Sequence, residues 1–479
     1  MSVTGGGWGV SLRSCDALIA RLEKNDPTLE MLVILPNKSF SSAEVDRIAS
    51  LLERGCNQQL RSIRASGHAI EPASLFRLGQ AIAAYQSKVE ELAIGNKDTG
   101  DDGVIALCNG LATGESFLQK IDLSYKAMGE KGFQTILETL GYNQHLTHLN
   151  LSRNPGIGSH RSLGEEAMYS EETETKKIFE HVVDLDLSDC NLCEEFSRGF
   201  FHALLPSVTS TSMNLMRTLR LSTNPMFGDS GFQHLSPLLL STTELYLSDC
   251  GLTDTSVSHL SIFVAEHSVP LKILDLSSNY ITSLGAESLA ECLVDERDGT
   301  DDAKQSTRFL SKLVYLNLSG NINIGEDGCV RIANALQRRC DLVQSNSLTS
   351  LDVSNTNCNI RGAVELIKKS GVKSLCLANN SLSSLGFREL AVCLKPNLPK
   401  TLETLDLACN NADSESVAQL LSSFKPEDGN QRSSLGSLQT LVIGGNQTSR
   451  AVEDLAIYLK KINDDLDIAR DKYRADTTW

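Results

Sequence analysis

Aspartate and asparagine recur at one fixed place in a repeated phrase, L-x-x-L-x-L-x-x-N, and these side chains are the first candidates for chemistry. One copy reads Leu271-Lys-Ile-Leu-Asp-Leu-Ser-Ser-Asn279, and another reads Leu146-Thr-His-Leu-Asn-Leu-Ser-Arg-Asn154. In both, a carboxylate or amide stands between the second and third leucines. A row of such groups can bind a protein partner through ion pairs and hydrogen bonds.

The same place in successive copies defines the Asp/Asn column. Strand residues in register on neighbouring strands lie about 4.8 Å apart, so stacked copies would place this column on one face. Arg220 and Tyr246 interrupt it and are of types enriched at binding hot spots. A second row, from Ser124 to Ser354, is made of small residues and keeps the face open. We predict protein-binding residues at Asp122, Asn150, Asp186, Arg220, Tyr246, Asp275, Asn317, Asp352 and Asp406. Cys376 completes the column. The alternative for any single member is that it only solvates the sheet.

The elements that position this column repeat along most of the chain. Leucines alternate with polar residues in each phrase, which predicts a strand with one buried face. A glycine such as Gly285 then opens a segment with helical spacing, and we expect its missing side chain to allow a tight turn into the helix. Fourteen copies begin at Leu29, Leu60, Val89, Leu118, Leu146, Val182, Met216, Thr242, Leu271, Leu313, Leu348, Val372, Leu402 and Leu438.

These repeats resemble the ribonuclease-inhibitor-like subfamily of leucine-rich repeat proteins over nearly the whole chain. The phrases starting at Val182 and Thr242, with Cys190 and Cys250 at the asparagine place, are the closest. The resemblance implies an α/β fold, a leucine-rich repeat solenoid (horseshoe) with a parallel concave sheet and convex α-helices. It also implies a protein-binding scaffold or regulator that uses the concave surface. Two other activities known in the subfamily stay open: activation of a GTPase of the Ran type, and regulation of actin or its capping proteins.

The overall composition restricts the class of partner that the protein is expected to bind. The 479 residues have a net charge of −16, which disfavours nucleic acid and anionic membranes and is compatible with a basic protein surface. The first residues lack the basic and apolar regions of a secretion signal. With 13 cysteines, we therefore expect free thiols in the cytoplasm, or alternatively in the nucleus. We expect a monomer.

Catalytic and metal-binding motifs are missing from the sequence. It contains no H-E-x-x-H, no paired C-x-x-C, no G-x-S-x-G and no phosphate-binding G-x-x-x-x-G-K-[ST]. We therefore predict no catalytic residue, no metal and no cofactor. A GTPase activator that orders its target's own catalytic groups would need no such motif, so that alternative remains.

The ends of the chain differ from the middle. We expect an N-terminal helical cap over residues 1–28, a solenoid of about 14 repeats over 29–450, and a C-terminal capping helix and tail over 451–479. An apolar stripe from Val452 to Tyr473 predicts one helix from Ala451 to Tyr473. That helix would fold back on the last repeat or, alternatively, pair two chains as a coiled coil. Acidic insertions at Gly158–Lys177 and Asp295–Lys304 are expected to be solvated loops.

Overall fold

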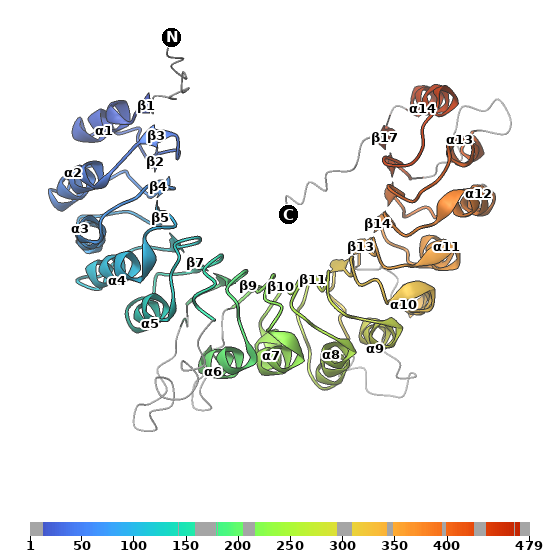
Figure 1. Ribbon diagram of the computed structural model, residues 1–479, viewed down its shortest axis with the longest axis horizontal. Coiled ribbons are helices and arrows are strands. Elements are labelled where there is room, and N and C mark those ends of the chain that lie inside the picture. Colours follow the sequence, from blue (N-terminus) through green and yellow to red (C-terminus); the bar gives the residue numbers. More distant parts are fainter. Residues whose placement is uncertain are drawn as a thin grey trace, which may run out of the picture. The chain divides into compact units, whose positions relative to one another are not determined.

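The computed structural model describes residues 13–141, 143–158, 179, 181–204, 216–294, 309–342, 348–394, 399–425, 437–463 and 465–469. The chain divides into two compact units, residues 1–224 and 225–479. In each unit, strands lie along one side and helices along the other (Figure 1). The two acidic insertions fall outside the described residues, apart from Gly158.

The first unit begins with the short elements β1 and α1 and continues as strand–helix repeats. Strands β2, β4, β5, β6, β7, β8 and β9 form a parallel sheet in chain order, and β1 pairs separately with β3. The elements are β1 (Arg13–Ser14), α1 (Asp16–Glu23), β2 (Met31–Val33), β3 (Lys38–Ser39), α2 (Ser42–Glu53), β4 (Ser62–Ser66), α3 (Pro72–Ala83), β5 (Glu91–Gly95), α4 (Gly100–Leu111), β6 (Lys120–Asp122), α5 (Glu130–Thr139), β7 (His148–Asn150), β8 (Asp184–Asp186), α6 (Glu194–Leu204) and β9 (Thr218–Arg220).

The second unit repeats the same plan, with strands β10 to β17 parallel and in chain order. Its elements are α7 (Gly228–Leu235), η2 (Ser236–Leu240), β10 (Glu244–Tyr246), α8 (Asp254–Glu266), β11 (Ile273–Asp275), α9 (Ser283–Leu293), β12 (Tyr315–Asn317), α10 (Gly325–Leu342), β13 (Ser350–Asp352), α11 (Asn359–Lys369), β14 (Ser374–Cys376), α12 (Ser383–Leu394), β15 (Thr404–Asp406), α13 (Ser414–Ser423), β16 (Thr440–Val442), α14 (Arg450–Ile462) and β17 (Asp467–Ala469).

All fourteen predicted repeats are confirmed as strands, each beginning two residues after the first residue of its phrase. The second residue of every one of these strands is buried, from Leu32 in β2 to Leu441 in β16. Its two neighbours on the strand point to the opposite face, as the period of two requires. The fold class inferred from the phrase, a leucine-rich repeat solenoid with a parallel sheet and helices on the other side, is therefore present in each unit.

The asparagine that ends the phrase ties one repeat to the next. Asn279 Nδ2 donates to the carbonyl oxygens of Leu247 and Leu276, at 2.8 and 2.9 Å. Its Oδ1 accepts the backbone N–H groups of Cys250 and Leu252, both at 3.0 Å. The side chain is 6% exposed, so no solvent would replace these bonds. The same pattern of bonds to the preceding repeat is made by Asn154, Asn224, Asn380, Asn410 and Asn446.

Other residues at the asparagine place make only part of this network. The Cys190 thiol donates to the carbonyl of Leu151 at 3.3 Å, and the Thr356 hydroxyl donates to that of Val353 at 2.7 Å. Lys126 is 2% exposed and donates from Nζ to the carbonyl of Ser124. Burial lowers the pKa of this ammonium group. Each substitute retains a donor to a buried carbonyl, which explains why the place tolerates thiol, hydroxyl and ammonium groups.

The glycines that open the helices are structural, as predicted, but the expected reason was wrong. Gly285 does not have the positive φ that a tight left-handed turn would require. A Cβ atom there would instead lie 2.3 Å from Asp254 Oδ1, which accepts the backbone N–H of Thr282 at 2.7 Å. Glycine is needed because a carboxylate of the preceding repeat approaches its backbone closely.

The prediction of one helix from Ala451 to Tyr473 was wrong. Helix α14 ends at Ile462, and β17 follows as a further strand paired with β16, with Leu441 opposite Ile468. Leu466 is 1% exposed and lies in the turn between them, not on a helical stripe. A coiled coil through this segment is therefore contradicted, since Asp467–Ala469 is extended. Residues 470–479 lie outside the described part.

Among the helices that the structure describes, none is both long enough and apolar enough to cross a membrane.

Substitution of Asn279 by alanine is expected to lower the free energy of unfolding by about 3 kcal/mol or more, because each buried backbone group left without a partner costs about 1–3 kcal/mol. Urea unfolding measures the change. Asn279→Cys is the matched control, since cysteine occupies this place in two other repeats and retains a donor. Its cost should be smaller than that of alanine. An alanine variant as stable as the wild type would contradict the role of this side chain.

Truncation after Asn463 is expected to reduce the denaturant midpoint of the second unit, because it removes β17 and the buried Leu466. Leu466→Ala alone should reproduce part of the loss, about 2–5 kcal/mol for a buried leucine. Unfolding followed by circular dichroism provides the comparison. If the truncated protein unfolds at the wild-type midpoint, β17 contributes nothing to the stability of the sheet.

Candidate protein-binding face

The Asp/Asn column is aligned across the strands of each unit. In the first unit, Asp122 pairs in register with Asn150, Asn150 with Asp186, and Asp186 with Arg220. In the second unit the column continues in register through Tyr246, Asp275, Asn317, Asp352, Cys376 and Asp406. The predicted contact residues thus form one row in each unit, on the face opposite the helices.

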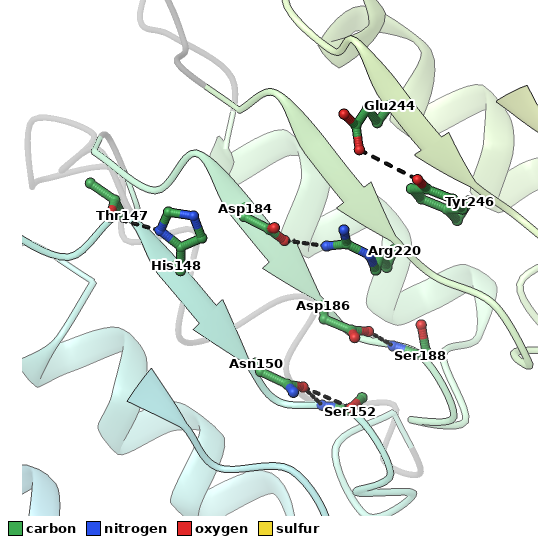
Figure 2. Close-up of polar contacts among 10 residues, drawn as sticks. All are labelled: Thr147, His148, Asn150, Ser152, Asp184, Asp186, Ser188, Arg220, Glu244 and Tyr246. Carbon is green, nitrogen blue, oxygen red and sulfur yellow. Dashed lines mark hydrogen bonds and ion pairs between the residues drawn. The ribbon is translucent and has the colours of Figure 1, made fainter. Parts of the chain in front are cut away.

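The acidic and amide members of this column have a structural task that the sequence analysis missed. Asp186 Oδ1 accepts the backbone N–H of Ser188 at 2.9 Å, and Asn150 Oδ1 accepts that of Ser152 at 3.1 Å (Figure 2). The same bond, two residues along, is made by Asp122, Asp275, Asn317, Asp352 and Asp406. Short polar side chains often close a turn in this way. One oxygen of each carboxylate is therefore committed to the turn, and the charge remains available.

A groove of about 380 Å³ lies on this face of the first unit. Its lining contains four carboxylates and three cationic side chains, namely Glu91, Asp122, Asp184, Asp186, Arg64, Lys120 and Arg220, together with His148 and Asn150. Five of these, Arg64, Glu91, Lys120, His148 and Asp184, were not predicted. Four of those five occupy the first strand position, two residues before the column. The period of two that located the column also places that position on the same face.

Most charges in this groove are paired within the protein. Arg220 contacts Asp184 at 2.5 Å (Figure 2), and Glu91 contacts both Arg64 at 2.7 Å and Lys120 at 3.1 Å. The hydrogen bond from Arg64 lowers the pKa of Glu91 to about 2, despite burial, which opposes the shift, and Lys120 and Ser62 lower it further. The first unit therefore presents a nearly balanced surface to a partner.

The second unit has a different surface chemistry. Tyr246 donates its hydroxyl to Glu244 at 3.4 Å (Figure 2). Burial raises the pKa of the Tyr315 phenol, and the nearby carboxylates of Asp352 and Asp275 raise it further. No lysine or arginine occurs within strands β10–β17. Aromatic rings and uncompensated carboxylates thus replace the ion pairs of the first unit.

Comparisons with known proteins found one matching family and several similar proteins. The family described as Leucine Rich repeat matches residues 142–159 and 267–290. Ribonuclease inhibitor of Sus scrofa is 26% identical over 323 residues, which cover 63% of this chain and 67% of that protein. RAN GTPase-activating protein 2 of Arabidopsis thaliana is 29% identical over 29% of this chain and 23% of its own length. Capping protein, Arp2/3 and myosin-I linker protein 3 of Homo sapiens is 27% identical over 62% of this chain and 22% of its own length.

The repeats of this chain are similar to those of ribonuclease inhibitor and of other leucine-rich repeat proteins. Within the described residues, no group of three histidine, cysteine, aspartate or glutamate side chains could hold a metal ion.

Asp406 differs from the other predicted contact residues of the repeat protein because it is only 5% exposed. Burial raises its pKa, against a hydrogen bond from the backbone N–H of Ala408 that lowers it. Asp352 and Cys376 lie close enough to influence the same carboxylate. The column therefore passes from accessible positions into a buried one at β15, where direct contact with a partner is restricted.

Asp406→Asn is expected to raise the melting temperature at neutral pH, since asparagine retains the Oδ1 acceptor for Ala408 and removes a buried charge. The pKa of Asp406 is raised in the folded protein, so stability falls as pH rises from the ordinary aspartate pKa towards this raised value, because the unfolded chain ionises first. Below the ordinary range of aspartate, both proteins should melt alike. Calorimetry across pH tests this, with Asp122→Asn as the half-buried control. A lower melting temperature of Asp406→Asn at neutral pH would contradict the assignment.

Proposed function

We propose that the protein is a non-enzymatic scaffold or regulator that binds a protein partner on the strand face of its repeats. The observation that supports this proposal is the aligned row of outward polar residues in each unit. Strands hold them rigidly in place, and the small serines beside them leave the face open. A preorganised surface of this kind binds a partner with little loss of its own conformational freedom.

A basic surface on the partner fits the charge of the protein. The net charge of −16 would attract a cationic protein and accelerate its association, and it would repel nucleic acid or an anionic membrane. Charged contacts of this kind set the rate and specificity of association more than the affinity. We propose that the protein acts as a monomer, since the row of outward polar residues in each unit is complete within one chain.

A reducing compartment is the proposed location, the cytoplasm first and the nucleus as the alternative. All 13 cysteines are free thiols, seven of them buried and the other six partly exposed. Burial raises the pKa of the Cys108 and Cys292 thiols to about 12, so they are unreactive at neutral pH. Thiols of this kind are typical of cores in reducing compartments.

Two regulatory activities are secondary candidates. Activation of a small GTPase is favoured by the similarity of part of the chain to RAN GTPase-activating protein 2. Regulation of actin capping is favoured by the similarity to the human capping protein linker. Both would use a bound protein and neither requires a catalytic motif in this chain. The identity of the partner separates them, since one predicts a GTPase and the other actin or a capping protein.

The triple variant Asp186→Asn, Asp275→Asn, Asp352→Asn tests the proposed face. Each asparagine can accept the same turn hydrogen bond, as Asn150 and Asn317 do, so only charge is lost. Partner binding, measured by quantitative cross-linking in cell extract and then with the purified partner, should weaken by about tenfold or more. The control variant Glu138→Gln, Glu389→Gln, Glu453→Gln makes the same charge change on exposed helix positions and should bind normally. Equal binding by the two triple variants would refute the assignment of the strand face.

A further inference from the structure

We propose that the strand face of the second unit binds a cationic protein segment, with a lysine or arginine side chain held by Tyr246, Tyr315, Asp275 and Asp352. This inference rests on the proposed function and adds a location and a chemistry to it. It assigns the binding of a cationic segment to one part of the surface, where carboxylates and aromatic rings occur together.

The four side chains come from consecutive strands. Tyr246 on β10 pairs in register with Asp275 on β11, and Asp275 pairs with Asn317 on β12. Asn317 pairs in turn with Asp352 on β13. Tyr315 lies two residues before Asn317 on the same face of β12. Burial raises the pKa of the Tyr315 hydroxyl, and Asp352, Asp275 and Tyr246 raise it further, so these three groups lie within electrostatic range of Tyr315.

The carboxylates of Asp275 and Asp352 are not neutralised by a cationic side chain of the described residues. Asp275 and Asp352 each use Oδ1 to close the turn at Ser277 or Ser354, and neither has an ion-pair partner among the described side chains. In the first unit, by contrast, Asp184 is paired with Arg220, and Glu91 with Arg64 and Lys120. The same fold therefore provides an internal comparison, because strands β10–β17 of the second unit contain no lysine or arginine.

A lysine or arginine bound at this face would offset the cost of burying the Asp352 carboxylate. Burial raises the pKa of Asp352, and the hydrogen bonds from Ser354 only partly oppose that shift. A carboxylate in such surroundings gains from an opposite charge more than an exposed one does. A lysine or arginine beside Tyr246 or Tyr315 would also gain a cation–π contact, about 0.5–2 kcal/mol depending on desolvation. A neutral or acidic segment would gain neither interaction.

The test uses the full chain and a fluorescent peptide of alternating arginine and glycine, with a glutamate–glycine peptide as the charge control. Fluorescence anisotropy measures the dissociation constant. The double variant Asp275→Asn, Asp352→Asn should weaken binding of the arginine peptide by about tenfold. The matched variant Glu389→Gln, Glu453→Gln removes the same charge from exposed helix positions of the second unit and should alter it by less than about twofold. Circular dichroism verifies that each variant is folded.

Tyrosine variants test the aromatic part. Tyr246→Phe and Tyr315→Phe retain the rings and should bind the arginine peptide like the wild type, whereas the leucine variants should bind more weakly. Wild-type affinity in both leucine variants would remove the rings from the proposal. Equal weakening by the aspartate pair and the helix glutamate pair would indicate attraction by net charge alone and overturn the location, as would a peptide that does not bind.

The outcome can be separated from that of the proposed function. If the second-unit variants leave peptide binding unchanged while the triple variant still loses its natural partner, the strand face binds a partner of another chemistry. If the triple variant retains its natural partner, the strand face itself is not the binding surface, and both proposals fail together.

Discussion

In the repeats that carry Asn279 or an equivalent asparagine, the bonds of one buried amide side chain hold the repeat against the preceding one. Asn279 and its equivalents donate to carbonyl oxygens on two repeats and accept two backbone N–H groups from the earlier repeat. The residue just before the asparagine place has a positive φ in many repeats, including Thr223 at 63° and Ser278 at 54°. A β-branched residue is rare in that conformation. In these repeats the amide bonds stabilise the turn that follows the strand.

Placement of the binding face follows from these turns. Because each strand ends at the same place in its repeat, Asp275, Asn317 and Asp352 lie in register without any direct bond among them. Their Oδ1 atoms then bond the next turn, so the polar column is part of the scaffold as well as a surface. Replacing aspartate by asparagine at one position separates the turn hydrogen bond from the negative surface charge, because only the charge differs.

Sequence reasoning succeeded where a feature depends on one repeat and failed where it depends on two. The alternation around Leu274 is local, and it predicted every strand in the fourteen repeats. The position of Gly285 against Asp254 and the ion pair between Asp184 and Arg220 depend on the spacing between repeats. The strand at Asp467–Ala469 was missed because Leu466 and Ala469 also fit the helical period that starts at Val452. Pairing with β16 decides the outcome there, and no pattern within the segment records it.

Hydroxyl-radical footprinting of the protein with and without its partner tests the central claim, that partners bind the strand face. Tyr246 and Tyr315 lie on that face, whereas Ile262 in α8 and Val392 in α12 are exposed helix residues, 61% and 69% accessible. The account predicts that oxidation of the two tyrosines decreases in the complex and that oxidation of Ile262 and Val392 does not. Protection of the helix residues, with the tyrosines oxidised as in the free protein, would contradict it.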